Sequence, residues 1–187
     1  MYVNIIGSNN SHLTLDYLAK YGNGDTFIET GTYLGDTVQL ALDAGFKTIH
    51  SVEIDNELFA TALNLFKDRP EVHIWLGDSL YELEKILSIV EGPATFWLDA
   101  HASGDLPGGK SGGSPVLDEL RLIEKHPCKD HTIFIDDRRL FGSKEWSGVK
   151  EQDAVDIIVK MDPLYKIYLL DGHIPKDILC ASKKDGL

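Results

Sequence analysis

ETGTYLGDT, residues 29–37, is the most informative stretch of the sequence, because here an apolar run leads into two closely spaced glycines and then into a helical pattern. The run TFIET (26–30) predicts a strand, and residues 36–44 predict a helix. Gly31 and Gly35 let the backbone turn tightly between the two and let a ligand approach closely. The first helical turn offers N–H groups to such a ligand. The stretch therefore predicts a strand–loop–helix unit with a binding site at its turn.

The same alternation of short apolar runs and helical patterns continues along the chain. Strands are predicted at 48–54, 72–78, 94–100 and 131–137, and helices at about 56–66, 79–90, 115–125 and 150–161. This alternation is typical of a parallel sheet covered by helices on both faces. Only GHIPK separates the last two apolar runs, 165–171 and 177–183, which is too short for a parallel crossover. These two runs predict an antiparallel hairpin.

The predicted fold class is therefore α/β. It is a Rossmann-like, mostly parallel sheet of about seven strands, with a terminal antiparallel hairpin and helices on both faces. No repeat or composition shift marks a second domain, so residues 1–187 are expected to form a single domain. Residues 1–25 are expected to be a short helical lead-in, with Leu13, Leu15, Leu18 and Tyr21 on one side. The glycine-rich residues 103–114 predict a long loop of the kind that often closes over a site.

Composition and charge exclude several classes of function. The net charge is −12, and no basic run offers a surface for nucleic acid or for an anionic membrane. No apolar run is long enough to span a membrane, and MYVNIIGSNN at the start has no signal-peptide pattern, so a cytoplasmic location is expected. Cys128 and Cys180 stand far apart beside apolar residues and are expected to be buried or half-buried thiols.

Acidic residues end the next two predicted strands. Glu53 ends the second, where a carboxylate can accept both hydroxyls of a ribose. Asp78 and Ser79 follow the third, where an acid beside a small residue can pair with the edge of an adenine. A nicotinamide dinucleotide site needs the pattern GxGxxG, but Glu29 stands at the first glycine position and would repel a pyrophosphate. A carboxylate there suits a cationic cofactor such as S-adenosylmethionine.

ETGTYLGDT, SVEID, LGDS and FWLDAH stand at the ends of four successive predicted strands. With these motifs and the terminal hairpin, the chain resembles the class I S-adenosylmethionine-dependent methyltransferases over nearly its whole length. The resemblance implies that Glu29 and Gly31 lie beside the methionine part of the cofactor and that Glu53 holds the ribose. Asp78 and Ser79 then meet the adenine. The implied cofactor site comprises Glu29, Gly31, Thr32, Tyr33, Gly35, Asp36, Thr37, Glu53, Asp78 and Ser79. The alternative is that such residues only cap helices, as Asp36, Asp55 and Ser79 are placed to do.

The fourth predicted strand ends in FWLDAH (96–101), which brings Asp99 and His101 to the same edge of the sheet. Asp136 and Asp137 end the fifth strand. Neighbouring strands lie about 4.8 Å apart, so the three carboxylates are expected to converge. Converging carboxylates repel one another unless a cation lies between them, and oxygen ligands favour Mg²⁺ or Mn²⁺.

This constellation resembles the metal-dependent O-methyltransferases, and within them the group that methylates sugar hydroxyls of natural products such as macrolides and aminocoumarins. The resemblance implies that Asp99, Asp136 and Asp137 bind the metal. It also implies that His101 is the catalytic base, with Asp99 as the second catalytic residue. The implied activity is methyl transfer to a hydroxyl of a sugar, another polyhydroxyl small molecule or a glycan. The other six histidines are expected to be ordinary structural or surface residues.

Two other functions stay open on the sequence. In a metal-independent methyltransferase, Asp99 would contact the substrate directly. In a non-catalytic subunit, the fold would bind S-adenosylmethionine or its product and serve a partner protein, although the intact Asp136–Asp137 pair and His101 count against this. A second copy of the chain, in a homo-oligomer, is a further candidate partner.

Overall fold

The computed structural model describes residues 12–99 and 114–185 of the chain. The predicted base His101 and residues 103–113 of the predicted loop lie outside these ranges. The strands are β1 (Thr26–Thr30), β2 (Thr48–Glu53), β3 (Val72–Leu76), β4 (Ala94–Leu98), β5 (Thr132–Ile135), β6 (Lys166–Leu170) and β7 (Ile178–Ser182). The helices are α1 (Leu15–Tyr21), α2 (Asp36–Asp43), α3 (Asn56–Leu65), α4 (Ser79–Ile89), α5 (Val116–Lys125), α6 (Glu151–Met161) and the 3₁₀ turn η1 (Arg138–Leu140). None of the helices described is long and apolar enough to cross a membrane.

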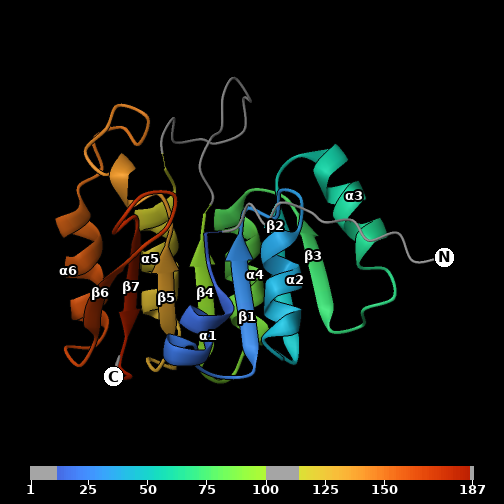
Figure 1. Ribbon diagram of the computed structural model, residues 1–187, viewed down its shortest axis with the longest axis horizontal. Coiled ribbons are helices and arrows are strands. Elements are labelled where there is room, and N and C mark those ends of the chain that lie inside the picture. The colour runs from blue at the N-terminus through green and yellow to red at the C-terminus, as the bar shows by residue number, and fades with distance from the viewer. Residues whose placement is uncertain (1–11, 100–113, 186–187) are drawn as a thin grey trace.

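The strands form one seven-stranded sheet in the order β3-β2-β1-β4-β5-β7-β6. β1 to β5 run parallel to one another, whereas β7 is antiparallel to both β5 and β6 (Figure 1). This confirms the predicted sheet and its terminal hairpin. The two hairpin strands do not follow β5 in chain order, because β7 lies between β5 and β6. All five residues of β7 are buried, whereas β6 forms the edge and is partly exposed.

Two apolar cores lie on opposite faces of the sheet. Phe27 and Ile28 show the division, because successive side chains of a strand point to opposite faces. Phe27 belongs to the core that packs against α1 and α2, and Ile28 to the core that packs against α4, α5 and α6 (Figure 1). The sheet is therefore covered on both faces, which explains why β4 and β5 are apolar runs that are buried throughout.

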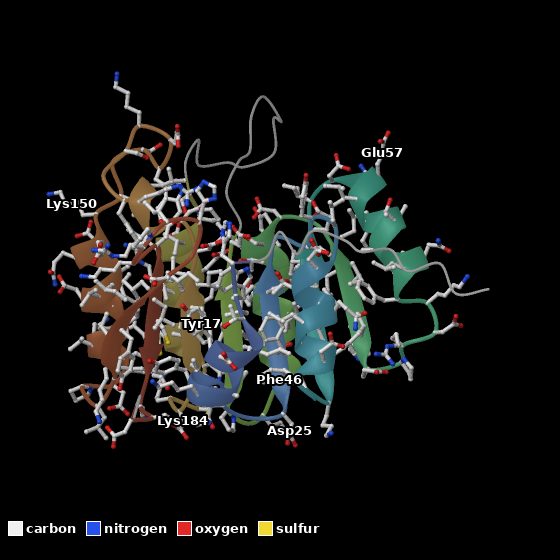
Figure 2. The ribbon with its side chains drawn as sticks, viewed as in Figure 1. Tyr17, Asp25, Phe46, Glu57, Lys150 and Lys184 are labelled. Atoms are coloured by element: carbon white, nitrogen blue, oxygen red, sulfur yellow. The ribbon has the colours of Figure 1, made fainter. Side chains whose placement is uncertain are left out.

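The predicted site residues lie along one of the two edges of the sheet that the strand ends form. Figure 2 shows Asp25, which directly precedes β1, at one edge, and Glu57, which lies in the first turn of α3 after β2, at the other. Because β1 to β5 are parallel, their carboxyl ends share the edge near Glu57. The predicted cofactor and metal residues within the described ranges all lie at or just beyond these carboxyl ends.

Candidate cofactor and metal site

Backbone hydrogen bonds hold the ends of β1, β4 and β5 side by side. The N–H of Asp99 donates to the carbonyl of Thr30 at 3.1 Å, and the N–H of Asp136 donates to the carbonyl of Leu98 at 3.2 Å. The hydrogen-bond ladder of the parallel sheet thus continues one residue beyond β4 and β5. These hydrogen bonds fix the backbone positions of Asp99 and Asp136 at the edge.

The loop after β1 is a tight turn that depends on two glycines. Gly31 has a φ of 100° and Gly35 a φ of 83°, both in the region that favours glycine. A Cβ at Gly35 would lie 2.8 Å from Cε2 of Phe66, so any other residue would be crowded as well as strained. Asp36 and Thr37 begin α2 directly behind this turn. The turn predicted from the two glycines is confirmed.

Glu53 joins the loop after β1 to the loop after β2. Its Oε2 accepts the N–H of Tyr33 at 2.8 Å, and its Oε1 accepts the N–H of Asp55 at 2.9 Å. The side chain is held in place, and Glu53 is 6 % exposed. A carboxylate oxygen can accept more than one hydrogen bond, so both oxygens can also accept ribose hydroxyls. This geometry suits the predicted role of Glu53.

Glu29 is fully buried at the end of β1. The hydroxyl of Ser51 donates to its Oε1 at 2.6 Å, while Oε2 has no hydrogen-bond partner among the described residues. Burial raises the pKa of Glu29 well above its usual value; the Ser51 hydrogen bond lowers this pKa, and the charges of Asp99 and Glu53 raise it. Glu29 therefore favours its neutral form, which attracts a cationic cofactor less than a carboxylate would. Its contact with the cofactor stays a prediction.

Two of the strand-end acids cap helices. Oδ1 of Asp78 accepts the N–H of Leu80 at 3.0 Å and caps α4. Oδ1 of Asp55 accepts two N–H groups of α3, at 2.8 and 3.0 Å. Ser79 is the buried first residue of α4 rather than its cap. A capping carboxylate keeps further lone pairs, so the adenine contacts of Asp78 and Ser79 stay a prediction.

One buried acid at this edge, Glu119 on α5, was not found from the sequence. It is 1 % exposed, and its Oε1 has no hydrogen-bond partner in the part of the chain that is described. Burial raises its pKa to about 7, although the hydroxyls of Ser79 and Thr30 act to lower it. The charges of Asp78 and Asp99 raise it further. A signal was present, because Glu119 is an acid on the otherwise apolar face of α5.

We expect Glu119→Gln to stabilise the metal-free protein at about pH 8, by about 1–3 kcal/mol. Because the folded state raises the pKa of Glu119 from 4.5 to about 7, its stabilising contribution is present below pH 4.5 and is lost as the pH rises to about 7. Glutamine stays neutral at every pH, so its advantage should vanish at about pH 4. Urea denaturation at both pH values checks this, with the exposed Glu84→Gln on α4 as the control. The same gain at both pH values would contradict a buried charge as the cause.

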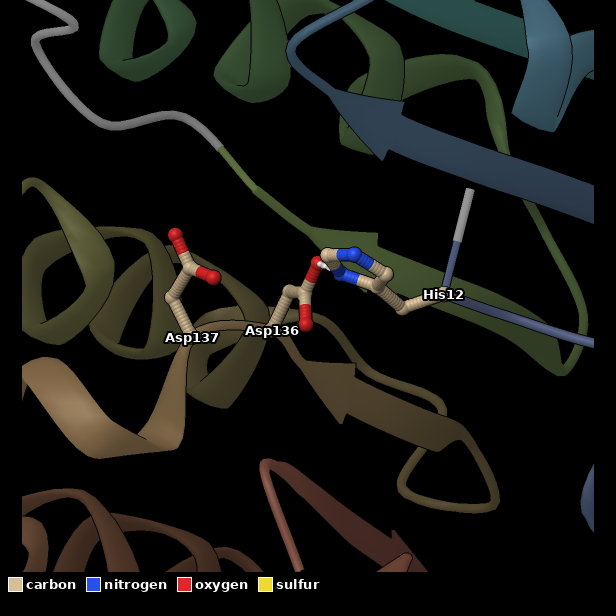
Figure 3. A group of neighbouring side chains, drawn as sticks. All are labelled: His12, Asp136 and Asp137. Atoms are coloured by element: carbon tan, nitrogen blue, oxygen red, sulfur yellow. Dashed lines mark hydrogen bonds and ion pairs between the residues drawn. The ribbon is translucent and has the colours of Figure 1, made fainter. Parts of the chain in front are cut away.

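Asp136 and Asp137 form a three-residue group with His12, which precedes α1 (Figure 3). Nδ1 of His12 lies 3.0 Å from Oδ2 of Asp136, and the ligand atoms of the three residues all lie within 4.8 Å of one another. His12, which was expected to be an ordinary residue, therefore lies beside a buried acid. It lies 124 positions from Asp136, and only the fold brings the two together.

Asp136 lies in a strongly acidic environment. Burial raises its pKa to about 6, and the charges of Asp99 and Asp137 raise it as well, while hydrogen bonds from the Asp137 backbone and from His12 lower it. Asp136 and Asp137 are 4 % and 5 % exposed. The carboxylates thus gather at this edge as predicted. Asp99 does not belong to the three-residue group, and its role as a metal ligand stays a prediction.

Arg139 partly balances these negative charges. Its Nη1 lies 2.5 Å from Oδ1 of Asp137 and also pairs with Oδ2 of Asp177, a buried residue just before β7. The backbone N–H of Arg139 donates to Oδ1 of Asp177 at 3.0 Å. Arg139 therefore fixes the orientation of the Asp137 carboxylate. The backbone of Asp137 has a φ of 54°, in the left-handed region.

No protein-family model and no curated protein sequence matches the chain. Solved structures do match it. Spermidine synthase from Thermotoga maritima matches with a TM-score of 0.60 and 16 % identity, over 94 % of this chain and 59 % of its own. Aeropyrum pernix fibrillarin with bound S-adenosyl-L-methionine matches with a TM-score of 0.59 and 19 % identity. The match covers 92 % of this chain and 76 % of the fibrillarin chain. The O-methyltransferase from Bacillus cereus in complex with SAH matches with a TM-score of 0.59 and 14 % identity. The match covers 90 % of this chain and 79 % of the O-methyltransferase chain.

The chain spans about 60 % of the length of the spermidine synthases that it matches. The chain has a seven-stranded sheet with five parallel strands, an antiparallel hairpin at its end and helices on both faces. The chain therefore has the fold of the class I S-adenosylmethionine-dependent methyltransferases.

Proposed function

We propose that the protein is an S-adenosylmethionine-dependent O-methyltransferase that uses a divalent cation. The proposed acceptor is a hydroxyl of a sugar, of another polyhydroxyl small molecule or of a glycan. One observation carries the proposal: the same edge of the sheet has Glu53 with the glycine turn at one point and the Asp136–Asp137 pair at another. Glu53 ends β2 and the Asp136–Asp137 pair follows β5, with β1 and β4 between these two strands, so the backbones of Glu53 and Asp136 lie about 14 Å apart along the edge. The glycine turn follows β1 and so lies between them. That separation leaves room for a cofactor beside an acceptor.

The charges at this edge favour S-adenosylmethionine over a dinucleotide. The cofactor carries a sulfonium and an amino group, both of which a negative edge attracts. A pyrophosphate would meet Glu53 and Asp99, and it would find Glu29 where a dinucleotide site has glycine. Glu53 accepts backbone N–H groups on both oxygens and so is already oriented for a ribose.

The proposed metal ligands are Asp99, Asp136 and Asp137, for Mg²⁺ or Mn²⁺. When bound, such an ion supplies positive charge that lowers the pKa of a neighbouring hydroxyl. His101, the proposed base, takes the proton of that hydroxyl. The alkoxide oxygen attacks the methyl carbon in line, the C–O bond forms as the C–S bond breaks, and a methyl ether and S-adenosylhomocysteine result. The main contribution of the chain is to hold the two reactants in line.

A calorimetric titration of the metal-stripped protein with S-adenosylhomocysteine tests the cofactor. We expect a dissociation constant on the order of micromolar for S-adenosylhomocysteine and no heat from NAD⁺. The titration is repeated with Mn²⁺ present. Binding of NAD⁺ and not of S-adenosylhomocysteine would overturn the proposal.

A chelator separates the proposal from its alternatives. The assay follows transfer of a labelled methyl group to a panel of free sugars, glycosides and glycans. Loss of transfer with chelator and recovery with added ion support the metal-dependent enzyme. Transfer that ignores the chelator favours the metal-independent enzyme, and binding of S-adenosylhomocysteine without transfer to any acceptor of the panel favours the non-catalytic subunit.

The proposal includes a cytoplasmic location and no nucleic-acid or membrane partner. Fibrillarin shares the fold, but the net charge of −12 on this chain opposes binding to a phosphate backbone. A homo-oligomer stays a prediction, which light scattering behind a sizing column would test.

A further inference from the structure

We infer that His12 is a ligand of the proposed metal ion, which makes the site a mixed nitrogen–oxygen site that prefers a transition-metal ion to Mg²⁺. The preferred ions are then Mn²⁺, Fe²⁺, Co²⁺ or Zn²⁺. The inference rests on the proposed function for the role of the ion. It adds a ligand from a segment outside the sheet, whereas the three acids proposed above all follow strands.

The spacing of the three side chains fits a metal ion. Two adjacent ligands of an octahedral ion with bonds of about 2.1 Å lie about 3.0 Å apart. Nδ1 of His12 and Oδ2 of Asp136 have this separation, 3.0 Å. Each of the three residues, Asp137 included, offers one ligand atom, and these atoms all lie within 4.8 Å of one another. Figure 3 shows the Asp136 carboxylate between the imidazole of His12 and the side chain of Asp137.

The position of His12 is set by its neighbours. Leu13 is fully buried in the core on the α1 face of the sheet. The hydroxyl of Thr14 caps α1 by accepting the N–H of Tyr17 at 3.2 Å. The hydroxyl of Tyr17 in turn donates to the carbonyl of Asp171, which follows β6, at 3.1 Å. These contacts fix the residues that directly follow His12, and they hold His12 beside Asp136.

A second observation concerns the oxygen of Asp136 that does not face His12. Oδ1 of Asp136 is buried and has no hydrogen-bond partner among the described residues. An unpaired buried acceptor destabilises the folded protein, and more strongly when it is charged. The neighbouring guanidinium, that of Arg139, pairs with Asp137 and Asp177. A cation beside Asp136 would supply the partner that this oxygen lacks.

The ligand set decides which ion is preferred. Mg²⁺ binds oxygen ligands and retains its water, whereas imidazole nitrogen suits transition-metal ions. The rival explanation is that His12 only forms an ion pair with Asp136, in which case the acids alone would bind an ion. The two explanations differ in whether a nitrogen lies in the first coordination shell.

Electron spin-echo spectroscopy of the protein loaded with Mn²⁺ tests this directly. We expect modulation from a directly bound nitrogen in the native protein and its disappearance in His12→Gln. His173→Gln is the matched control, because the ring centroid of His173 lies 5.4 Å from that of His12, yet His173 is outside the three-residue group. The nitrogen modulation of His173→Gln should match that of the native protein. Absence of nitrogen modulation in the native protein would overturn the inference, even if His12→Gln failed to fold.

Metal titrations give the second readout. We expect His12→Gln to lower the affinity for Mn²⁺ and Co²⁺ by about tenfold or more and to leave the affinity for Mg²⁺ nearly unchanged. Equal losses for all three ions, or no loss for any, would overturn the inference. Binding of S-adenosylhomocysteine is measured on the same samples. If the nitrogen ligand is present but S-adenosylhomocysteine does not bind, the proposed function fails while the metal site stands.

Discussion

Replacing Glu53 with glutamine should lower the affinity for S-adenosylhomocysteine by about 100-fold. In the native protein, the two carboxylate oxygens accept the N–H groups of Tyr33 and Asp55. Glutamine must point its NH₂ group at one of these donors, so one backbone N–H loses its partner and the loop on that side is displaced. The variant also loses the negative charge that strengthens hydrogen bonds from the ribose hydroxyls. Calorimetric titration of S-adenosylhomocysteine measures the loss.

Glu57→Gln is the matched control for Glu53→Gln. Glu57 lies in the first turn of α3, four residues from Glu53, and its side chain is exposed (Figure 2). The same change of charge there should leave the affinity within about twofold, because exposed charges interact weakly. If Glu53→Gln binds as tightly as the control, Glu53 does not hold the ribose, and the cofactor site has been placed on the wrong residues.

Most of the fold could be predicted from the sequence because its signals are local. TFIET and the other apolar runs match strands to within one or two residues. The order of β6 and β7 could not be predicted, since either strand of a hairpin can join the sheet. Burial decides it: ILCAS of β7 is apolar enough to lie between two strands, whereas KIYLL of β6 begins with a lysine and suits an edge.

The lead-in shows how a local pattern can mislead. Leu13, Leu15, Leu18 and Tyr21 were expected on one side of a helix. The helix begins at Leu15, so Leu13 lies ahead of it but is buried in the same core as Leu18 and Tyr21, while Leu15 is 46 % exposed. The cap that Thr14 provides sets this start and so takes Leu13 out of the helical pattern.

The candidate site could be predicted only as a set of strand ends. The sequence places Glu53, Asp99 and Asp136 at one edge because parallel strands share their direction. It does not tell which groups these acids meet. Glu53 binds backbone N–H groups, which no side-chain pattern encodes. His12 reaches Asp136 from the far end of the chain, and Glu119 reaches the edge from a helix. Such contacts depend on tertiary packing rather than on spacing.

Replacing Asp136 with asparagine should lower methyl transfer by about 1000-fold, the largest effect that we predict. A metal ion contributes several kcal/mol to the stabilisation of charge in a transition state, and about 4 kcal/mol corresponds to this factor. Asparagine keeps the shape of the side chain and one oxygen but removes the charge that holds the cation. Initial rates at saturating cofactor and Mn²⁺ measure the loss. Asp68→Asn, an exposed change between α3 and β3, should keep the native rate.

Stability distinguishes a lost metal ligand from a damaged fold in Asp136→Asn. In the metal-free protein, Asp136 is a buried carboxylate beside Asp99 and Asp137, and its Oδ1 has no partner among the residues described. A neutral side chain relieves this repulsion, so the metal-free variant should melt at or above the temperature of the native protein. Added Mn²⁺ should raise the melting temperature of the native protein and not that of the variant, because only the native protein binds the ion tightly. A variant that loses activity and melts well below the native protein would point to a structural role for Asp136. A variant that keeps full activity would remove Asp136 from the metal site.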